Sequence, residues 1–239
     1  MIVITGVTKI YGGKVKALDN VSLTVDEGCI YGFLGPNGAG KTTTIKLIAG
    51  IIQPDGGTIT VDGYDTKKEA LSAKMRTGFV PDDPNIFLRL KGIEYLAFMA
   101  DMYGVPSKER SDNINIMAER FDMQNALSDR IQSYSHGMRQ KIVIMGALMH
   151  KPRVWILDEP MTGLDPKSAF ELKSMMREHA DAGNTVFFST HVLEVAEKVC
   201  DKAAVIGAGR ILYAGGIHDM IKSSDVSLEK IFLEMTQNA

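Results

Sequence analysis

The chain has 239 residues, of which 45% are hydrophobic and 23% are charged, and its formal net charge is -2. These values are typical of a globular protein that buries a sizeable core. The near-zero net charge excludes an overall basic surface of the kind that holds nucleic acid through its phosphates. We therefore expect any recognition of phosphate to be local, and we expect no nucleic-acid partner.

The cellular location is predicted from the cysteines and from the apolar segments. Cys29 and Cys200 are too few for a disulfide framework and have no metal-ligand spacing. The first residues do not have the pattern of a signal peptide. The most apolar stretches, such as IVIMGALM, are shorter than the ~20 residues that cross a bilayer. We expect a cytoplasmic protein that would need a separate membrane-spanning chain for any role in transport.

The predicted elements begin with strands that lead into a glycine-rich loop. Apolar runs bounded by turn residues predict strands at 3–7, 21–25, 30–35 and 57–63. The third of these runs directly into the loop, and a helix is predicted after it from Thr43 to Ala49. A phosphate-binding loop requires this order of strand, loop and helix.

The pattern becomes helical from about Lys91 to His150, in IEYLAFMADMYG, NINIMAERFDM and GMRQKIVIMGALMH. The chain then alternates between the buried strand VWILD, a helix from about Lys167 to Ala182, the strand TVFFST and a short helix near LEVAEKVC. This alternation predicts a mainly parallel sheet covered on both faces. The segment AAVIGAGRILYAG predicts a hairpin after it.

The loop GPNGAGKTT matches the phosphate-loop pattern GxxxxGK[ST]. Its glycines let backbone N–H groups surround phosphate oxygens, and the next helix points its positive end at the same anion. Lys41 is expected to reach the β and γ phosphates, Thr42 to ligate Mg²⁺, and Thr43 to help hold the α phosphate. The alternative is a glycine turn that merely precedes a helix. The predicted nucleotide-binding residues of the loop are Gly35, Pro36, Asn37, Gly38, Ala39, Gly40, Lys41, Thr42 and Thr43.

A second motif, VWILDEP, places Asp158 and Glu159 at the end of an apolar strand, where parallel sheets present ligand-binding groups. Asp158 is predicted to assist Mg²⁺, and Glu159 to orient and deprotonate an attacking water. The alternative is a solvated strand end. His191 follows the strand TVFFST and is predicted to contact the γ phosphate or the water, with a structural histidine as the alternative. With Lys41, Glu159 and His191 are the predicted catalytic residues.

The phosphate loop, YSHGMRQK, ILDEP, TGLDP and STH together resemble the ATP-binding cassette (ABC) ATPase family over nearly the whole chain. YSHGMRQK stands in place of the family's signature motif LSGGQ: Ser135 and Gly137 match, whereas His136 and Met138 replace glycine and glutamine. The resemblance implies that Ser135 and Gly137 bind the γ phosphate held by a second cassette. Ser135 also has the character of a helix N-cap, and a plain cap is the alternative.

Three further positions are interpreted through the same resemblance. TGLDP resembles the D-loop that links the two sites, which adds Asp165 to the nucleotide-binding residues, with a helix-capping turn as the alternative. Tyr11 resembles the aromatic residue that stacks on adenine, with simple packing as the alternative. Asp82 stands where the Q-loop has glutamine, and we expect it, with Thr42 and Asp158, to meet Mg²⁺ or its water; a solvated turn is the alternative.

The resemblance implies an α/β fold: a P-loop NTPase core with a mainly parallel sheet, an N-terminal antiparallel β subdomain and an inserted helical subdomain. We expect a single domain over 1–239. The core with its β subdomain is expected in about 1–85 and 151–220, the helical subdomain in about 86–150, and a C-terminal helical extension in 221–239.

The resemblance also implies an ATPase that uses ATP and Mg²⁺, pairs with a second cassette, and drives a separate membrane permease from the inner face of the membrane. The ending SLEKIFLEMT and YSHGMRQK look most like the bacterial export branch that handles drugs, antibiotics or lipid-linked molecules. The alternatives are an importer ATPase, a soluble ABC ATPase acting on nucleic acid or the ribosome, and a cassette that binds ATP without hydrolysing it.

Overall fold

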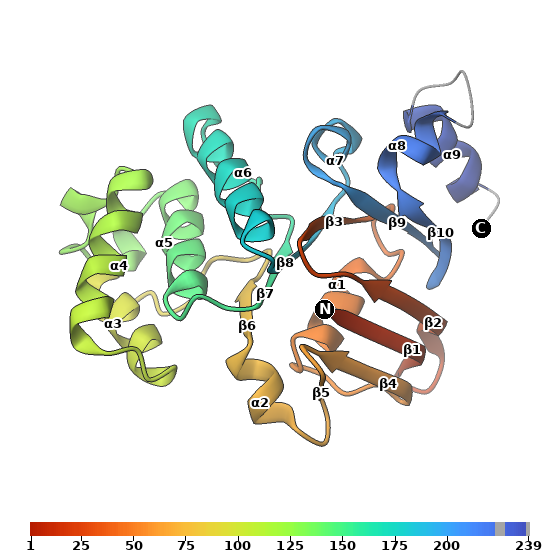
Figure 1. The fold of residues 1–239 in the computed structure, drawn as a ribbon, viewed down its shortest axis with the longest axis horizontal. Coiled ribbons are helices and arrows are strands. Elements are labelled where there is room, and N and C mark those ends of the chain that lie inside the picture. Colours follow the sequence, from red (N-terminus) through yellow and green to blue (C-terminus); the bar gives the residue numbers. More distant parts are fainter. Residues whose placement is uncertain (223–227, 238–239) are drawn as a thin grey trace.

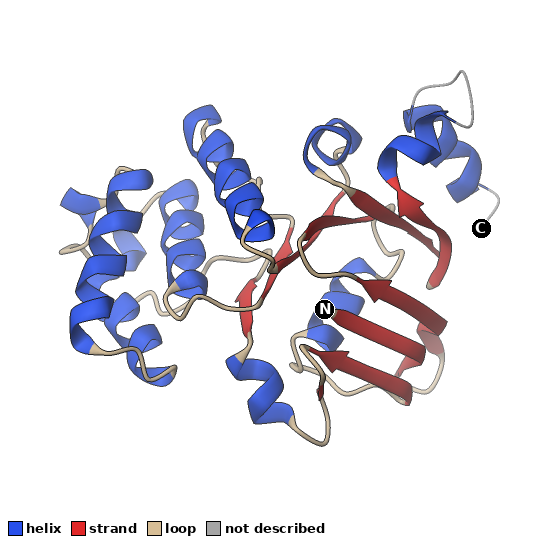
Figure 2. Ribbon diagram, in the orientation of Figure 1, coloured by secondary structure: helices blue, strands red, loops and turns tan. Residues whose placement is uncertain are grey.

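Two β-sheets and a group of helices form the structure, a computed structural model that describes residues 1–222 and 228–237 (Figure 1 and Figure 2). The smaller sheet has the strand order β2-β1-β4-β5 and is antiparallel. Along β1 and β2, buried apolar residues alternate with more exposed ones, as expected for a sheet with one face on a core. Its strands are β1 Ile2–Tyr11, β2 Val15–Val25, β4 Gly56–Val61 and β5 Tyr64–Asp65.

The larger sheet has the strand order β10-β9-β3-β8-β7-β6. Its neighbours are parallel except for β9 and β10, which form the predicted antiparallel hairpin. Every residue of β3, β7 and β8 is buried, so both faces of the sheet are covered. Its strands are β3 Cys29–Leu34, β6 Thr77–Val80, β7 Val154–Asp158, β8 Thr185–Thr190, β9 Lys202–Gly207 and β10 Arg210–Gly216.

Two hydrophobic cores lie on opposite faces of this sheet, because alternate residues of β3 belong to different cores. Tyr31 and Phe33 pack with α1 and the antiparallel sheet, whereas Ile30 and Leu34 belong to the core that contains α6, α7 and the helical subdomain. The bounds of these helices are α1 Lys41–Ile48, α6 Pro166–Asp181 and α7 Leu193–Val199. The carboxyl ends of β3, β7 and β8 therefore meet at one edge, between the two cores.

The predicted helical subdomain projects from the core sheet, and Figure 1 shows it at the left. It consists of α3 (Gly92–Met102), α4 (Ser107–Arg120) and α5 (His136–Leu148), with two short 3₁₀ turns between α4 and α5. Helix α5 packs against β6 of the core sheet as well as against α3 and α4, and eight of its residues are buried. Its first residue follows Ser135, so the signature segment opens the helix that joins the two parts.

Some elements differ from the prediction. Helix α1 begins at Lys41, two residues before the predicted Thr43, because the last loop residues already take helical geometry. Helix α2 (Ala70–Met75) and strand β6 were not predicted. The C-terminal extension begins with α8 (Ile217–Lys222) and continues with α9 (Leu228–Gln237); its residues 223–227 and 238–239 lie outside the described residues. None of the helices in the described ranges combines the length and hydrophobicity of a membrane span.

Candidate functional site

The phosphate loop connects β3 to α1 and has a backbone that only glycine accommodates at several positions. Gly38 and Gly40 have φ values of 81° and 111°. A Cβ atom on Gly35 would lie 2.5 Å from the carbonyl oxygen of Ile206, and one on Gly40 would lie 2.8 Å from that of Ala17. The loop is therefore pressed against its neighbours on one side, and its other side faces a cavity.

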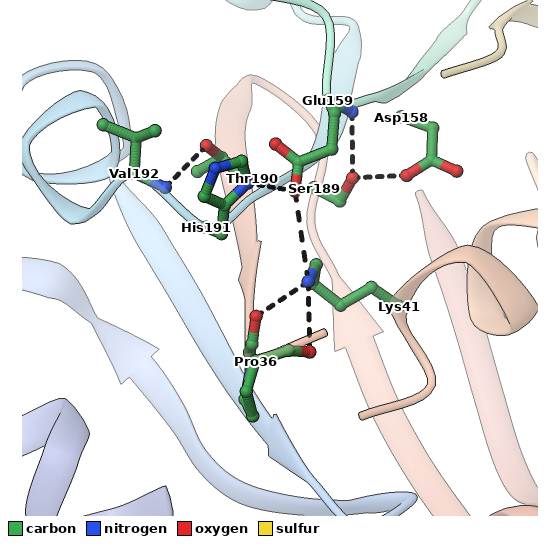
Figure 3. Close-up of polar contacts among 9 residues, drawn as sticks. Pro36, Lys41, Asp158, Glu159, Ser189, Thr190, His191 and Val192 are labelled. Atoms are coloured by element: carbon green, nitrogen blue, oxygen red, sulfur yellow. Dashed lines mark hydrogen bonds and ion pairs between the residues drawn. The ribbon is translucent and has the colours of Figure 1, made fainter. Parts of the chain in front are cut away.

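Lys41 occupies the centre of this loop, and its side chain is only 7% exposed. Its Nζ atom donates hydrogen bonds to the carbonyl oxygens of Gly35 at 2.7 Å and Pro36 at 3.3 Å (Figure 3). The loop thus wraps around the ammonium group and points it at the same cavity. Burial lowers the pKa of Lys41, and the charges of Glu159, Asp158 and Asp82 oppose that effect.

The cavity encloses about 220 Å³. Most of the predicted loop residues line it, together with Asp82 and Glu159. Of the remaining predicted loop residues, Gly35 and Pro36 hold Lys41, and Ala39 is buried behind the loop. The lining residues are Ala17, Asn37, Gly38, Gly40, Lys41, Thr42, Thr43, Asp82 and Glu159.

Asp158 ends β7 and is 2% exposed. It accepts hydrogen bonds from the Ser189 hydroxyl, at 2.6 Å, and from the hydroxyl of Thr42. Burial raises the pKa of Asp158, and the neighbouring charges of Asp82 and Glu159 add to that rise, whereas the two hydroxyls oppose it. The predicted metal ligands Thr42, Asp82 and Asp158 therefore do lie together.

Glu159 lies between the loop and the end of β8. Its Oε1 atom is 3.0 Å from Nδ1 of His191 and 3.9 Å from Nζ of Lys41 (Figure 3). The φ of Glu159 is 47°, in the left-handed region that non-glycine residues rarely adopt, and its backbone N–H donates to the Ser189 hydroxyl at 3.0 Å. The three predicted catalytic residues are thus brought into one cluster.

The charges of the cavity fit a magnesium nucleotide. Three carboxylates, those of Asp82, Asp158 and Glu159, surround the single ammonium of Lys41. Such a cavity would repel a polyphosphate unless a divalent cation entered with it. The described residues contain no group of three or more His, Cys, Asp or Glu side chains arranged to hold a metal alone. In proteins, Mg²⁺ commonly takes one or two carboxylates and completes its shell with water and phosphate oxygens.

The remaining predicted residues lie outside this cavity. Ser135 is exposed and caps α5, with its Oγ accepting from the N–H of Met138 at 3.3 Å, and Gly137 follows it in the first turn. Asp165 caps α6, and its carboxylate also lies 3.0 Å from Nζ of Lys141. The hydrogen bond from the N–H of Ser168 is the main cause that lowers the pKa of Asp165 below its usual range. Tyr11 ends β1, is 42% exposed, and has Nζ of Lys9 against its ring.

Ser189 is a residue that sequence reasoning missed. It is fully buried in β8, directly opposite Asp158 in the register of β7 and β8, and its hydroxyl contacts both acidic residues of the site. The string STH contained it, but only the pairing of two strands far apart in sequence shows which residues its hydroxyl meets. No local pattern could have identified that role.

Comparisons with known proteins identify the family of this chain. Residues 18–162 match the model of the ABC transporter family. The chain is 35% identical to ABC transporter ATP-binding protein NatA of Bacillus subtilis, covering 93% of this chain and 92% of that protein. It is also 35% identical to Nod factor export ATP-binding protein I of Cupriavidus metallidurans, over 91% and 71% of the two chains. A solved ATP-binding subunit of an ABC transporter superposes with a TM-score of 0.93 at 29% identity, covering 98% and 99%.

Proposed function

The chain belongs to the ABC transporter family as an ATP-binding subunit with ATPase activity, and from this premise we propose that Glu159 is its general base and that two cassettes pair around two nucleotides. One observation carries the proposal. The Glu159 carboxylate lies at the cavity wall, between the ammonium of Lys41 and the imidazole of His191. A base in this position can reach a water molecule that faces a phosphate held by the loop.

In the proposed reaction, Glu159 accepts a proton from a water molecule while the oxygen of that water bonds to the γ phosphorus. The bond between the γ phosphorus and the bridging β–γ oxygen breaks, and ADP leaves with the electrons of that bond. Lys41 holds negative charge on the transferred phosphoryl group. His191 fixes the direction of the Glu159 carboxylate through their 3.0 Å contact. Mg²⁺, held by Thr42, Asp158 and Asp82, would supply positive charge against the phosphates when bound.

Pairing is supported by the residues that stand away from the cavity of their own chain. The exposed start of α5 at Ser135 and Gly137 presents the positive end of a helix. In the proposed pair, this helix start and Asp165 face the nucleotide of the other copy. Tyr11, exposed at the end of β1, would stack on adenine. Each site would then be complete only when both cassettes are present.

We further propose export through a separate membrane permease, with this subunit on the inner face of the membrane. The support is the similarity to a protein named for Nod factor export, together with a chain whose described helices include no membrane span. Purification from native membranes in mild detergent tests this. Recovery with a permease and no soluble substrate-binding protein is the expected result, and a complex that includes such a binding protein would indicate import.

The hydrolysis itself is tested by phosphate release from ATP and Mg²⁺, measured for the wild-type chain and for Glu159→Gln. The amide keeps the size of the side chain but cannot accept the proton. We expect turnover to fall by about a hundredfold or more, since general-base catalysis contributes ~10²–10⁴-fold. Retention of normal turnover in Glu159→Gln would assign the base to another group.

A further inference from the structure

His136 is the residue of the signature segment that departs most from the family pattern, because an imidazole stands where glycine is usual. It is the first residue of α5 and is exposed, yet one side of its ring packs on another part of the same chain. A Cβ atom on Gly163 would lie 2.2 Å from Nδ1 of His136 and 2.9 Å from its Cε1 atom. The ring therefore fills the space that a side chain at position 163 would need.

The backbone at the same place is equally close. A Cβ atom on Gly137 would lie 2.6 Å from the carbonyl oxygen of Gly163, and the φ of Gly163 is 76°. Side chains are thus excluded at both glycines, and the backbone at Gly137 and the ring of His136 both pack on the turn at Gly163.

Two more residues of α5 hold the same loop. Gln140, one helical turn after His136, is 1% exposed and donates from Nε2 to the carbonyl oxygen of Pro160 at 3.4 Å. Lys141 lies 3.0 Å from Asp165. Helix α5 therefore contacts the loop 160–165 at its beginning, its middle and its end.

This loop starts at the proposed base. The N–H of Thr162 donates to the carbonyl oxygen of Glu159 at 3.2 Å, and the N–H of Leu164 donates to that of Met161 at 3.3 Å. Gly163 thus follows a turn that closes on Glu159 itself. The left-handed backbone of Glu159 is held by this turn and by the Ser189 hydroxyl. We therefore expect a displacement of the turn at Gly163 to change the direction of the Glu159 carboxylate.

We propose that His136 is a positioning residue for hydrolysis: its ring fixes the turn at Gly163 against α5 and thereby holds Glu159 in line with Lys41 and His191. The inference rests on the proposed role of Glu159 as the base. It gives the unusual signature residue a function within its own chain, in addition to any contact of this helix start with a second cassette.

The test uses the full-length chain and the variants His136→Ala, Gly163→Ala, the double variant and His136→Phe. For His136→Ala we expect kcat to fall about tenfold, since small misplacements of catalytic groups cost up to ~10²-fold, with the affinity for a fluorescent ATP analogue and the thermal midpoint unchanged. His136→Phe keeps a planar ring and recovers most of the rate. His218→Ala removes an exposed histidine on α8, remote from α5 in Figure 1, and serves as the matched control.

The two alanine substitutions remove the same contact, because a Cβ at position 163 displaces the ring. The double variant should therefore be no slower than the slower single variant. The proposal would be overturned if the loss of kcat in the double variant equalled the product of the two single losses, or if His136→Ala had a normal kcat. Loss of ATP-dependent pairing when His136→Ala is added to Glu159→Gln would also overturn it, since the residue would then act at the interface. If Glu159→Gln alone turned over normally, the proposed base would fail instead.

Discussion

The hydroxyl of Ser189 donates to Oδ1 of Asp158 at 2.6 Å, and Oγ of Ser189 accepts a hydrogen bond from the N–H of Glu159 at 3.0 Å. One buried side chain therefore fixes both acidic residues at the end of β7. The Ser189 side chain orients the Asp158 carboxylate, which faces Thr42, and it holds the backbone of Glu159, whose φ lies in the left-handed region. The site depends on a strand that contributes neither the phosphate loop nor the base.

Ser189→Ala tests this dependence. The substitution removes one of the two hydroxyl groups that donate to the buried Asp158 carboxylate, and it takes away the acceptor of the Glu159 N–H. We expect this to cost about 1–3 kcal/mol of unfolding free energy. We also expect kcat to fall while ATP affinity stays close to normal, because the loop itself is unchanged. Stability from chemical unfolding and rates from phosphate release give the two values. Ser174→Ala, which removes an exposed hydroxyl hydrogen bond to Glu178 outside the site, is the control. Equal unfolding free energies and equal kcat values in the two variants would contradict the role of Ser189 in holding Asp158 and Glu159.

Lys41 and Glu159 should separate binding from chemistry. Lys41→Ala removes the ammonium that the loop points into the cavity, and we expect ATP affinity to fall about tenfold to a hundredfold, the effect of a charge-assisted hydrogen bond worth ~1.5–3 kcal/mol. Glu159→Gln should bind ATP normally. Lys46→Ala, on the exposed face of the same helix, is the matched control. Equilibrium titration with a fluorescent ATP analogue measures all three, and equal losses in Lys41→Ala and Glu159→Gln would reject the separate roles.

Ser135→Arg should block pairing without affecting the binding of ATP to the single chain. A bulky cation at the start of α5 would occupy the interface, while the cavity is built from other segments of the chain. Light scattering with ATP, in the Glu159→Gln background, measures the pairing. Ser111→Arg places the same side chain on the exposed surface of α4 and should pair normally. Normal pairing of Ser135→Arg would show that this helix start does not face a partner.

His150 predicts how stability depends on pH. Its ring stacks on Tyr103, with ring centroids 3.5 Å apart, and burial lowers its pKa from 6.5 to about 4, against a smaller opposing effect of the Thr77 carbonyl. The folded chain therefore binds this proton less tightly than the unfolded chain. Its contribution to stability is complete above pH 6.5 and is lost as the pH falls towards 4.

The variant His150→Phe keeps a ring against Tyr103 and removes the titrating group. Within that pH window, the free energy of unfolding of the wild-type chain should fall more steeply, by about 1.4 kcal/mol per pH unit for this one proton. His179, whose pKa burial also lowers to about 4, adds the same trend in both proteins. Urea unfolding at several pH values gives the slopes, and equal slopes in the two proteins would refute a buried neutral His150.

The sequence predicted the elements that carry strong local signals. The N-terminal strands, the parallel core, the helical insert and the cap at Ser135 are confirmed, because each has an apolar period or a capping residue of its own. The antiparallel pairing of the N-terminal strands, which the family resemblance implied, is also confirmed. Helix α2 has six residues, one of them buried and no side-chain cap, so it gives little periodicity. Strand β6 has four residues, and its position depends on pairing with β7.

The site was predictable in its parts but not in its connections. The phosphate loop and the pair Asp158 and Glu159 are contiguous motifs, and the structure brings them together with His191 and Asp82. Contacts between distant segments have no such signal. The register that places Ser189 opposite Asp158, and the packing of His136 on Gly163, arise only when the chain has folded. The stacking of Tyr11 on adenine stays a prediction, and so do the roles of Ser135, Gly137 and Asp165 toward a second cassette.

The central claim is that ATP is shared between two copies of this chain, and the mass of Glu159→Gln in solution tests it most directly. The variant should bind ATP and hold it, since the proton acceptor is lost while the cavity remains. We predict a monomer without nucleotide and a dimer containing ATP when ATP and Mg²⁺ are added. A chain that binds ATP and remains monomeric at high protein concentration would contradict pairing of identical copies around the nucleotide.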